Sequence, residues 1–488
     1  MVFSTIIFLC AFLPITIIGY YLMPAKLKNY FLLIMSLLFY AWGEPRFVWI
    51  MLGSILCNYG FGIWIDADSG AAASLRRKKA VVGMSVVLNI GILFVFKYLA
   101  FATENIQKLI ESFPIVTIAL PIGISFYTFQ GLSYVIDVYR GEKAQRNPFR
   151  LALYISMFPQ LIAGPIVRYK DVSESLEKRN HTAKQFASGA ERFIIGLAKK
   201  AILANMTGAL ANSIMTSDVA VMGMSVAWLG ALSYTLQIYF DFSGYSDMAI
   251  GLGRIFGFEF MENFNYPYIS RSVREFWRRW HISLSGWFRD YLYIPLGGNR
   301  KGNVYVNLAL VFLATGIWHG ADWGFLLWGI WHGIFIVAER FLAGRKETGK
   351  ARKGFANGVI CSVLGWFYTM FVVVMGWVLF GIVDVKAFVS YVKVMFGANV
   401  GAYTAYGIRY YLSNQMIFYL LVAILACIPW KQMLLQMPWV KQRPEGCISS
   451  NVQMVCEIWK KIVLLGLLLL CYVFVINSSY NPFIYFRF

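Results

Sequence analysis

The feature that most constrains this chain is a series of apolar runs, each roughly 20 residues long, separated by short basic segments. A helix of that length matches the hydrocarbon core of a bilayer, which is about 30 Å thick. Because lipid offers no hydrogen-bond partners, backbone groups in that environment must bond to one another, which favours helices. Of the 488 residues, 59% are apolar and 14% are charged, whereas soluble domains carry about 25% charged residues. The sequence therefore predicts an all-α polytopic membrane protein.

We expect about 11–12 transmembrane helices and define their boundaries to within a few residues. The candidate spans cover residues 3–23, 30–42, 46–65, 80–101, 115–137, 190–213, 225–250, 304–320, 323–341, 356–382, 415–433 and 461–479. Residues 154–167 are apolar too, but Pro159, Gly164 and Pro165 interrupt them. We expect a re-entrant segment there, with its backbone buried against protein. Because no polar linker separates globular blocks, residues 1–488 are interpreted as a single membrane-embedded domain.

The formal net charge of +20 comes from basic residues clustered between the apolar runs. This pattern is typical of membrane orientation rather than of nucleic-acid binding. The positive-inside rule predicts extracytoplasmic termini in a plasma membrane, with the first apolar run as an uncleaved span. The lipid bilayer is the expected partner, and no nucleic acid is expected. The seven cysteines lack CxxC spacing and predict neither a disulfide framework nor a metal site.

Residues 271–291 are predicted to form an amphipathic helix at the cytoplasmic interface. One face carries Trp277, His281, Leu284 and Phe288, and the other carries Arg271, Arg274, Arg278 and Arg289. A cationic collar of six residues is predicted there: Arg271, Arg274, Arg278, Arg279, Arg300 and Lys301. Anionic lipid headgroups are one expected partner of the collar. The alternative is a phosphate-bearing acyl donor, such as coenzyme A or the phosphopantetheine of a carrier protein.

The motif GIWHG occurs twice, starting at Gly316 and at Gly329, which places His319 and His332 thirteen residues apart. On a continuous helix, steps of about 100° would turn these two side chains toward different faces. We expect residues 320–324 to break the helix instead. With either arrangement, the two histidines are not expected to face one small site.

Histidine is the side chain best suited to move a proton near neutral pH, and the chain has four. His319 ends an apolar span, where an ionisable group indicates function; it could act as general base on a hydroxyl or bond a neighbouring carbonyl. His281 could serve chemistry or cap an interfacial contact. His332 is interpreted as a packing residue and His181 as part of a solvated loop.

Asp241 and Asp247 lie near the inner end of the span 225–250. Gln237 and Asp241 are one helical turn apart, as are Ser243 and Asp247. Hydrogen bonding between helices and substrate handling explain this pattern equally well.

Several long motifs resemble the membrane-bound O-acyltransferase family, in particular the bacterial branch that O-acetylates polysaccharides. They are FQGLSYVIDVYRG from Phe129, FPQLIAGPIVRY from Phe158, YFDFSGYSDMAIGLGRIFGF from Tyr239, EFWRRWHISLSGWFRDYLYIPLGGNR from Glu275, GIWHGADW from Gly316 and SSYNPFIYFRF from Ser478. The resemblance implies a ring of helices, with re-entrant and interfacial helices, around a tunnel, and core motifs at about residues 120–340.

The resemblance also implies site residues. The histidine of the family's later WHG motif matches His319, the implied catalytic residue, and His281 matches a second functional position toward the cytoplasm. Many eukaryotic members carry asparagine or aspartate at that second position. We further assign Arg278, Arg279, Trp318 and Asp241 to substrate binding.

The activity implied is transfer of an acetyl group from a cytoplasmic thioester, acetyl-CoA, for O-acetylation of an exported polysaccharide, with no bound cofactor. His319 would take the proton of the acceptor hydroxyl. An extracytoplasmic acetyltransferase of the SGNH type, the polysaccharide itself or an acyl carrier protein are the implied partners. Transfer of D-alanine from a carrier toward teichoic acid is the alternative. A non-enzymatic transporter is a further alternative, although the chain shows no inverted repeat.

Overall fold

The computed structural model describes residues 2–67, 72–346, 355–398, 406–436 and 450–477. Within these ranges the chain is helical and contains no strand, as the apolar runs predict. The terminal motif from Ser478, and with it the position of the C-terminus, lies outside the described residues.

The helices up to the middle of the chain are α1 (Leu13–Leu22), α2 (Lys28–Gly43), α3 (Val48–Asp66), α4 (Ala72–Leu93), α5 (Leu99–Gln107), α6 (Ile124–Tyr139), α7 (Pro148–Ser156), α8 (Phe158–Leu161), α9 (Tyr169–Glu177), α10 (Ala183–Ala198), α11 (Asn205–Met215) and α12 (Met224–Ile255). Those that follow are α13 (Val273–Arg279), α14 (Ile282–Phe288), α15 (Val304–His319), α16 (Trp323–Lys346), α17 (Phe355–Gly381), α18 (Val385–Met395), α19 (Ile408–Tyr411), α20 (Asn414–Ala426), α21 (Trp430–Gln436) and α23 (Ser450–Asn477). Short π-helical stretches are η1 (Phe8–Phe12), η2 (Phe94–Tyr98), η3 (Lys199–Ala204) and η6 (Arg289–Tyr293), and short 3-10 stretches are η4 (Val219–Val221) and η5 (Pro267–Ile269).

A helix accompanies every expected span. Among the described residues, six helices are long and apolar enough to cross a membrane by themselves: Val48–Asp66, Leu75–Gln107, Ala183–Met215, Trp323–Ala343, Gly358–Gly381 and Met454–Asn477. Three more apolar helices are shorter: Phe8–Leu22, Val304–His319 and Asn414–Ala426. The expected span 115–137 is wrong in its first third, because α6 begins only at Ile124, after the prolines at 114 and 121. The chain is a multi-pass membrane protein.

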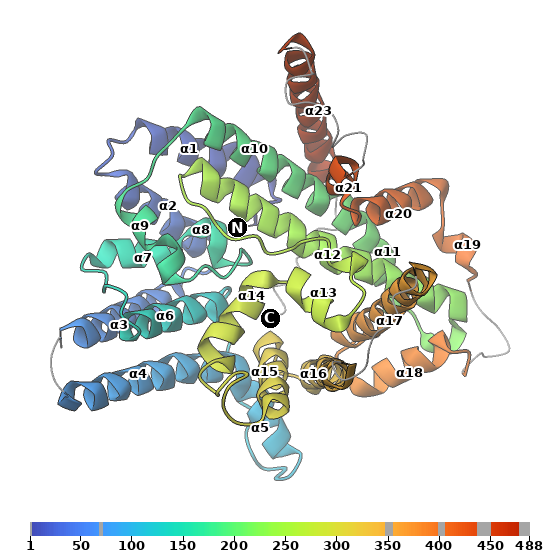
Figure 1. Cartoon of the computed structure of the whole chain (residues 1–488), viewed down its shortest axis with the longest axis horizontal. Helices are drawn as coiled ribbons and strands as arrows, with labels where there is room; N and C mark the ends of the chain where they lie inside the picture. Colours follow the sequence, from blue (N-terminus) through green and yellow to red (C-terminus); the bar gives the residue numbers. More distant parts are fainter. Residues whose placement is uncertain (1, 68–71, 347–354, 399–405, 437–449, 478–488) are drawn as a thin grey trace.

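Helix α12 crosses the middle of the molecule (Figure 1), and every residue from Thr235 to Gly253 is buried. This explains a composition that is unusual for a span. A helix surrounded by other helices can carry Asp247, because Arg192 and Lys199 rather than lipid satisfy its carboxylate. The opposite case is α23, which is largely exposed and projects from the rest of the molecule (Figure 1).

Helices α10 and α12 approach each other through two glycine pairs. A Cβ atom at Gly196 would lie 2.6 Å from the carbonyl oxygen of Gly244, and one at Gly189 would lie 2.6 Å from that of Gly251. The two pairs are separated by seven residues along each helix, so the contact repeats after two helical turns. Small residues let helix backbones meet closely inside a membrane protein. This contact fixes α12, and the site elements that pack on it, against the N-terminal half.

The interrupted segment 154–167 is buried throughout, as the re-entrant prediction requires. Helix α7 ends at Ser156, the short helix α8 follows, and residues 162–168 are irregular. Side chains bond the backbone polar groups of this segment. The Phe158 N–H donates to Ser36 Oγ of α2 at 3.2 Å, and the hydroxyl of Tyr154, within the segment, donates to the Val167 carbonyl at 2.9 Å. Irregular backbone is thus held by protein on all sides.

We predict that Gly196→Ala destabilises the protein by about 1–3 kcal/mol, because the added methyl meets backbone that cannot rotate away. Gly91→Ala in α4 is the matched control, since a Cβ there meets nothing within 4 Å. Thermal unfolding of the purified protein in detergent measures both. Equal melting temperatures for the two variants would contradict the close contact.

Candidate active site

The predicted interfacial helix over residues 271–291 is wrong as one continuous helix. Helix α13 ends at Arg279 and α14 starts at Ile282, with His281 between them in the left-handed region at φ 44°. Cα–Cβ sterics disfavour this conformation for most residues, so the amphipathic pattern cannot continue through it. The break turns His281 into the interior, where its side chain is 1% exposed.

His281 is held by the loop that precedes α13. Its Nδ1 lies 3.0 Å from Oδ1 of the buried Asn263, and its ring makes an edge contact with Phe242 of α12 at 4.6 Å between centroids. Burial without a charged partner lowers the pKa of His281 to about 3. The imidazole is therefore neutral, so one ring nitrogen donates a hydrogen bond and the other accepts one.

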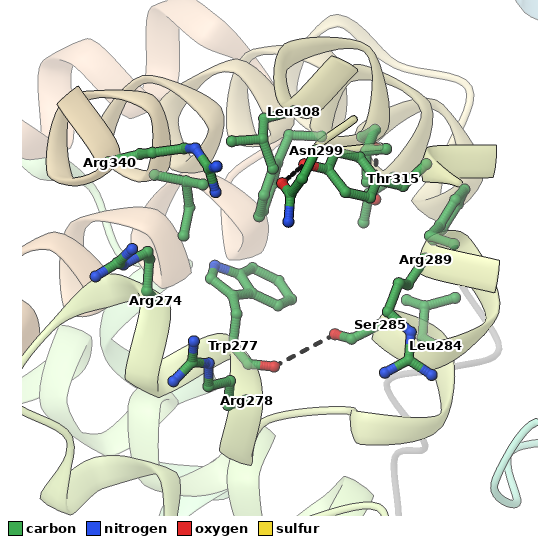
Figure 2. Close-up of a pocket in the computed structure, with 15 residues that line it drawn as sticks. Arg274, Trp277, Arg278, Leu284, Ser285, Arg289, Asn299, Leu308, Thr315 and Arg340 are labelled. Carbon is green, nitrogen blue, oxygen red and sulfur yellow. Dashed lines mark hydrogen bonds between the residues drawn. The ribbon is translucent and has the colours of Figure 1, made fainter. Parts of the chain in front are cut away.

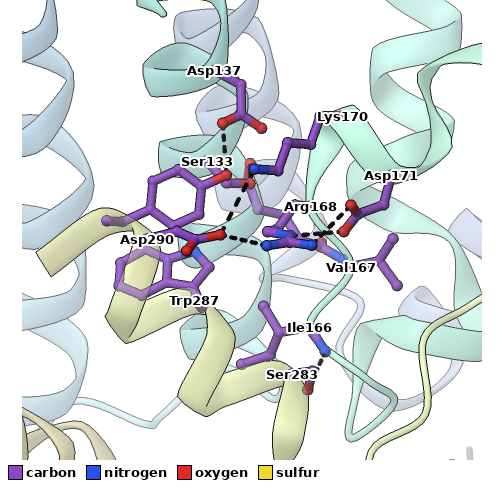
Figure 3. Close-up of polar contacts among 12 residues, drawn as sticks. Ser133, Asp137, Ile166, Val167, Arg168, Lys170, Asp171, Ser283, Trp287 and Asp290 are labelled. Carbon is purple, nitrogen blue, oxygen red and sulfur yellow. Dashed lines mark hydrogen bonds and ion pairs between the residues drawn. The ribbon is translucent and has the colours of Figure 1, made fainter. Parts of the chain in front are cut away.

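The interrupted segment supports α14 from the other side, as Figure 3 shows. The Ile166 N–H donates to Ser283 Oγ at 3.0 Å, and the Arg168 guanidinium pairs with Asp290 and Asp171. Lys170 lies 3.7 Å from the same Asp290 carboxylate. The FPQLIAGPIVRY motif thus supplies the backbone and charges that hold the WHISLSGWF motif in place.

The break after the first GIWHG is confirmed: α15 ends at His319 and α16 starts at Trp323. The glycines that open the two GIWHG copies face each other across the hairpin. A Cβ at Gly316 would lie 3.1 Å from the Cα of Gly329, and one at Gly329 would lie 3.0 Å from the Cα of Gly316. The duplication therefore serves close helix packing, and it brings both motif histidines against the same layer.

That layer is a chain of alternating histidine and tryptophan rings. Ring centroids are 6.2 Å apart for His281 and Trp318, 4.8 Å for Trp318 and His319, 4.9 Å for His319 and Trp328, and 5.0 Å for Trp328 and His332. His319 and His332 both contact Trp328, but His332 lines neither of the two cavities described below, so the prediction that the two histidines do not face one small site is not contradicted. The tight glycine contact brings the two helices close enough for one indole to lie between both imidazoles.

On one side of this layer is a cavity of about 290 Å³, which we call the arginine pocket (Figure 2). Its lining combines four arginines with an apolar interior: Arg274, Trp277, Arg278, Leu284, Ser285, Phe288, Arg289, Tyr293, Asn299, Leu308, Val311, Phe312, Thr315, Ile336 and Arg340. Trp277 forms its inner wall and lies 5.7 Å from Trp328, the tryptophan that contacts His319. Trp277 also lies 5.2 Å from His332, so it separates the pocket from the histidine layer.

Beyond His319 is a second cavity of about 310 Å³, which we call the Lys97 pocket. Its lining includes Lys97, Gly320, Asp322 and Phe380, and the Phe380 ring lies 5.3 Å from His319. The buried Lys97 ammonium donates to Ser125 Oγ and to the Trp318 carbonyl, near the end of α15. Sequence reasoning missed this residue, although a lysine within an apolar span is itself a signal of function.

The four residues predicted to bind substrate lie in different parts of the structure. Arg278 lines the arginine pocket, whereas Arg279 pairs with Glu275 at 2.9 Å and donates to the Asn265 carbonyl. Trp318 lies in the histidine layer and stacks on Phe129. Asp241 lies 2.6 Å from the Lys200 ammonium, and both side chains are 1% exposed. This ion pair joins α12 to η3, which favours the structural interpretation of Asp241.

Comparison with known proteins gives a family match and several similar sequences. Residues 145–380 match the sequence model of the membrane-bound O-acyltransferase family. The chain is 39% identical over 509 residues to "Probable alginate O-acetylase AlgI" of Pseudomonas putida, covering 100% of both chains. It is 34% identical over 435 residues to "Peptidoglycan O-acetyltransferase" of Helicobacter pylori, covering 82% of this chain and 80% of that one. The chain belongs to the membrane-bound O-acyltransferase family.

Membership makes the protein an acyltransferase. A lower similarity reaches "Teichoic acid D-alanyltransferase" of Bacillus subtilis, at 32% identity over 215 residues, which cover 41% of this chain and 53% of that protein. The matched range 145–380 contains the interrupted segment, α12 to α16, both histidine motifs and most of the lining of both cavities. Most elements of the site thus lie in the matched range, whereas Lys97 and Ser125 precede it.

We predict that Asp241→Asn destabilises the protein by about 3–5 kcal/mol, because it leaves the Lys200 charge buried without its partner. The double substitution Lys200→Met with Asp241→Leu should recover most of that loss. Glu177→Gln, which breaks the exposed pair with Arg150, is the control and should change stability by about 0–1 kcal/mol. Thermal unfolding in detergent measures all three. Wild-type stability in Asp241→Asn together with lost activity would instead support substrate binding.

Proposed function

We propose that the protein transfers an acetyl group from acetyl-CoA to an acceptor hydroxyl on the opposite side of the membrane, for O-acetylation of a cell-surface or exported polysaccharide. The observation that carries the proposal is the set of ring contacts that His319 makes toward two cavities of different chemistry. Trp328 lies between it and Trp277, which lines the arginine pocket, and the ring of Phe380, which lines the Lys97 pocket, lies 5.3 Å from it. The names of the two O-acetylating relatives support acetyl as the group transferred. The acceptor is the polysaccharide or an intermediate carrier of the acetyl group.

The arginine pocket suits the donor. Four guanidinium groups can bind the phosphates of coenzyme A by charge-assisted hydrogen bonds, and the apolar interior around Trp277 and Phe312 suits the narrow pantetheine arm. The thioester would then lie at the inner wall against Trp277, with Trp328 between that tryptophan and His319. We place this pocket on the cytoplasmic side, where acetyl-CoA is found, and this orientation follows from the distribution of basic loops.

The Lys97 pocket suits the acceptor. An ammonium and the Asp322 carboxylate both line it, so it offers a hydrogen-bond donor and an acceptor to a hydroxyl-bearing ligand. In a plasma membrane this pocket would face the exterior. An SGNH-type acetyltransferase outside the membrane is the partner we propose for the final transfer to the glycan.

In the proposed reaction, His319 takes the proton of the acceptor hydroxyl as the oxygen attacks the thioester carbonyl. The C–S bond breaks, the acetyl group forms an ester with the acceptor, and the proton passes to the leaving thiolate of coenzyme A. A buried imidazole is suited to this role because it is neutral before the attack. The Lys97 ammonium, bonded to the carbonyl of Trp318, holds the end of α15 and hence the backbone that carries His319.

Transfer of D-alanine from a carrier protein remains the second candidate, favoured by the similarity to the teichoic acid enzyme. Membranes that contain the protein can be given labelled acetyl-CoA or a D-alanyl carrier protein in parallel. Label in an extracytoplasmic ester from acetyl-CoA alone supports the first function. Label from the carrier alone would replace it with the second.

We predict that His319→Ala lowers acetyl transfer by a hundredfold or more, because general-base catalysis contributes about 10²–10⁴. His181→Asn is the control, since this histidine bonds Tyr20 and lines neither cavity. Glycan O-acetyl content and the amount of protein in the membrane are measured together. Full activity in properly inserted His319→Ala would end the proposal of a general base.

We predict that Arg278→Gln raises KM for acetyl-CoA about tenfold and leaves kcat almost unchanged. One charge-assisted hydrogen bond contributes about 1.5 kcal/mol or more, and it is formed by substrate and transition state alike. Arg300→Gln is the matched control, because this exposed arginine belongs to the predicted collar but does not line the pocket. Initial rates at varied acetyl-CoA concentration provide the test. Equal effects of both substitutions would indicate a diffuse cationic surface rather than a pocket.

A further inference from the structure

The hydrogen bonds around Asn263 determine which nitrogen of His281 carries the proton. Asn263 is fully buried, and its Oδ1 lies 3.0 Å from Nδ1 of His281. The two side chains are joined by one hydrogen bond, whose donor depends on the orientation of the amide. That orientation can be read from the other neighbours of Asn263.

The amide oxygen is identified by a group that can only donate. The backbone N–H of Ser283 points at Oδ1 of Asn263 from 3.2 Å, and the Ser283 hydroxyl lies 2.8 Å from the same atom. On the other side, Nδ2 of Asn263 lies 3.0 Å from Ser246 Oγ. A flipped amide would set its NH₂ against the Ser283 N–H, two donors facing each other, so the oxygen must face Ser283 and His281.

The interrupted segment fixes the serine in turn. Ser283 Oγ accepts a hydrogen bond from the Ile166 N–H at 3.0 Å, which directs the hydroxyl hydrogen away from Ile166 and toward Asn263. Ile166, Ser283 and Asn263 thus form a relay of defined polarity. The relay runs from backbone of the FPQLIAGPIVRY motif to the imidazole of the WHISLSGWF motif.

An amide oxygen accepts hydrogen bonds and cannot donate them. Nδ1 of His281 must therefore carry the hydrogen, which leaves a lone pair on Nε2. This Nε2 is buried and meets no hydrogen-bond partner in the part of the chain that the structure describes. Buried polar atoms in native proteins are nearly always paired, so an orphan of this kind marks a place for a ligand or an ordered water.

We propose that Asn263 and Ser283 are positioning residues that hold His281 as the Nδ1–H tautomer, with Nε2 as a hydrogen-bond acceptor in the histidine–tryptophan layer. Its function in acyl transfer rests on the function proposed above, whereas the tautomer itself does not. In this state His281 cannot donate to a developing oxyanion. It can receive the hydrogen of a hydroxyl, amide or thiol group, and so differs in function from the indole N–H of its neighbour Trp318.

The same reasoning gives His332 the opposite tautomer and provides an internal reference. The indole N–H of Trp277 lies 3.4 Å from Nδ1 of His332. Because an indole N–H is only a donor, Nδ1 accepts and Nε2 carries the hydrogen. A cavity cannot open at that Nε2, since a Cβ on Gly376 would lie 2.6 Å from it. His332 therefore remains a packing residue, as the sequence predicts.

The test is nitrogen NMR of the full chain in lipid bilayers, with ¹⁵N-labelled histidine. The chain has only four histidines, so His281→Asn and His332→Asn assign the two signals. We expect Nδ1–H for His281 and Nε2–H for His332. An Nε2–H or doubly protonated His281 in the unsubstituted protein would overturn the proposal.

Two substitutions separate positioning from folding. Asn263→Leu should remove the tautomer preference of His281 and leave the His332 signal unchanged, and acetyl transfer should fall at least tenfold. Asn263→Asp retains an acceptor oxygen, so Nδ1–H and much of the activity should return. An unchanged His281 tautomer in Asn263→Leu contradicts the relay. A changed tautomer with unchanged acetyl transfer contradicts its functional part while leaving the proposed function intact.

Discussion

The hydrogen bond from the Ile166 N–H to the Ser283 hydroxyl joins the irregular backbone after α8 to the first turn of α14, directly after the α13–α14 break. Irregular backbone and helix ends are stable inside an apolar protein only when other parts of the chain form hydrogen bonds with their polar groups. Each polar group without a partner costs several kcal/mol. The interrupted segment, the loop before α13 and the residues at the α13–α14 break form hydrogen bonds with one another. None of the three could hold its conformation alone. The site is therefore a property of their assembly and not of any single motif.

The buried helix α12 is the support for this assembly. Its inner face offers Ser246 to Asn263 and Phe242 to His281, while Asp241 and Asp247 hold basic residues of α10 and η3. The glycine contacts with α10 set the distance at which these bonds form. Packing on one side of α12 and hydrogen bonding on the other are thus coupled, and a disturbance of the first should be transmitted to the histidine layer.

Sequence patterns revealed those features that depend on local residue types. Apolar run length predicted the helices, and the prolines and glycines of residues 154–167 predicted the interruption. The GIWHG repeat located the turn after His319. The family motifs identified the chemistry in advance, although the composition alone left acyl transfer and transport both open.

Features that depend on partners distant in sequence could not be predicted. The amphipathic period over residues 271–291 continues without a gap, yet the contacts of His281 with Asn263 and Phe242 break the helix. Six cationic residues appeared equivalent in the collar, but Glu275 engages Arg279, while Arg278 lines the pocket. The role of Lys97 could not be predicted either, because nothing near it in sequence shows that its ammonium donates to Ser125 and to the Trp318 carbonyl.

The left-handed backbone at His281 has a consequence for how this position can evolve. Only two described residues other than glycine have a positive φ, and this is one of them, at 44°. Asparagine, aspartate and histidine tolerate that conformation far better than branched or bulky residues do. Asparagine and aspartate are therefore the substitutions of His281 that the main chain would tolerate best, whatever chemistry the imidazole performs. Lineages could exchange the imidazole for another polar group and keep the fold intact, so this single position lets the reaction diverge on a constant scaffold.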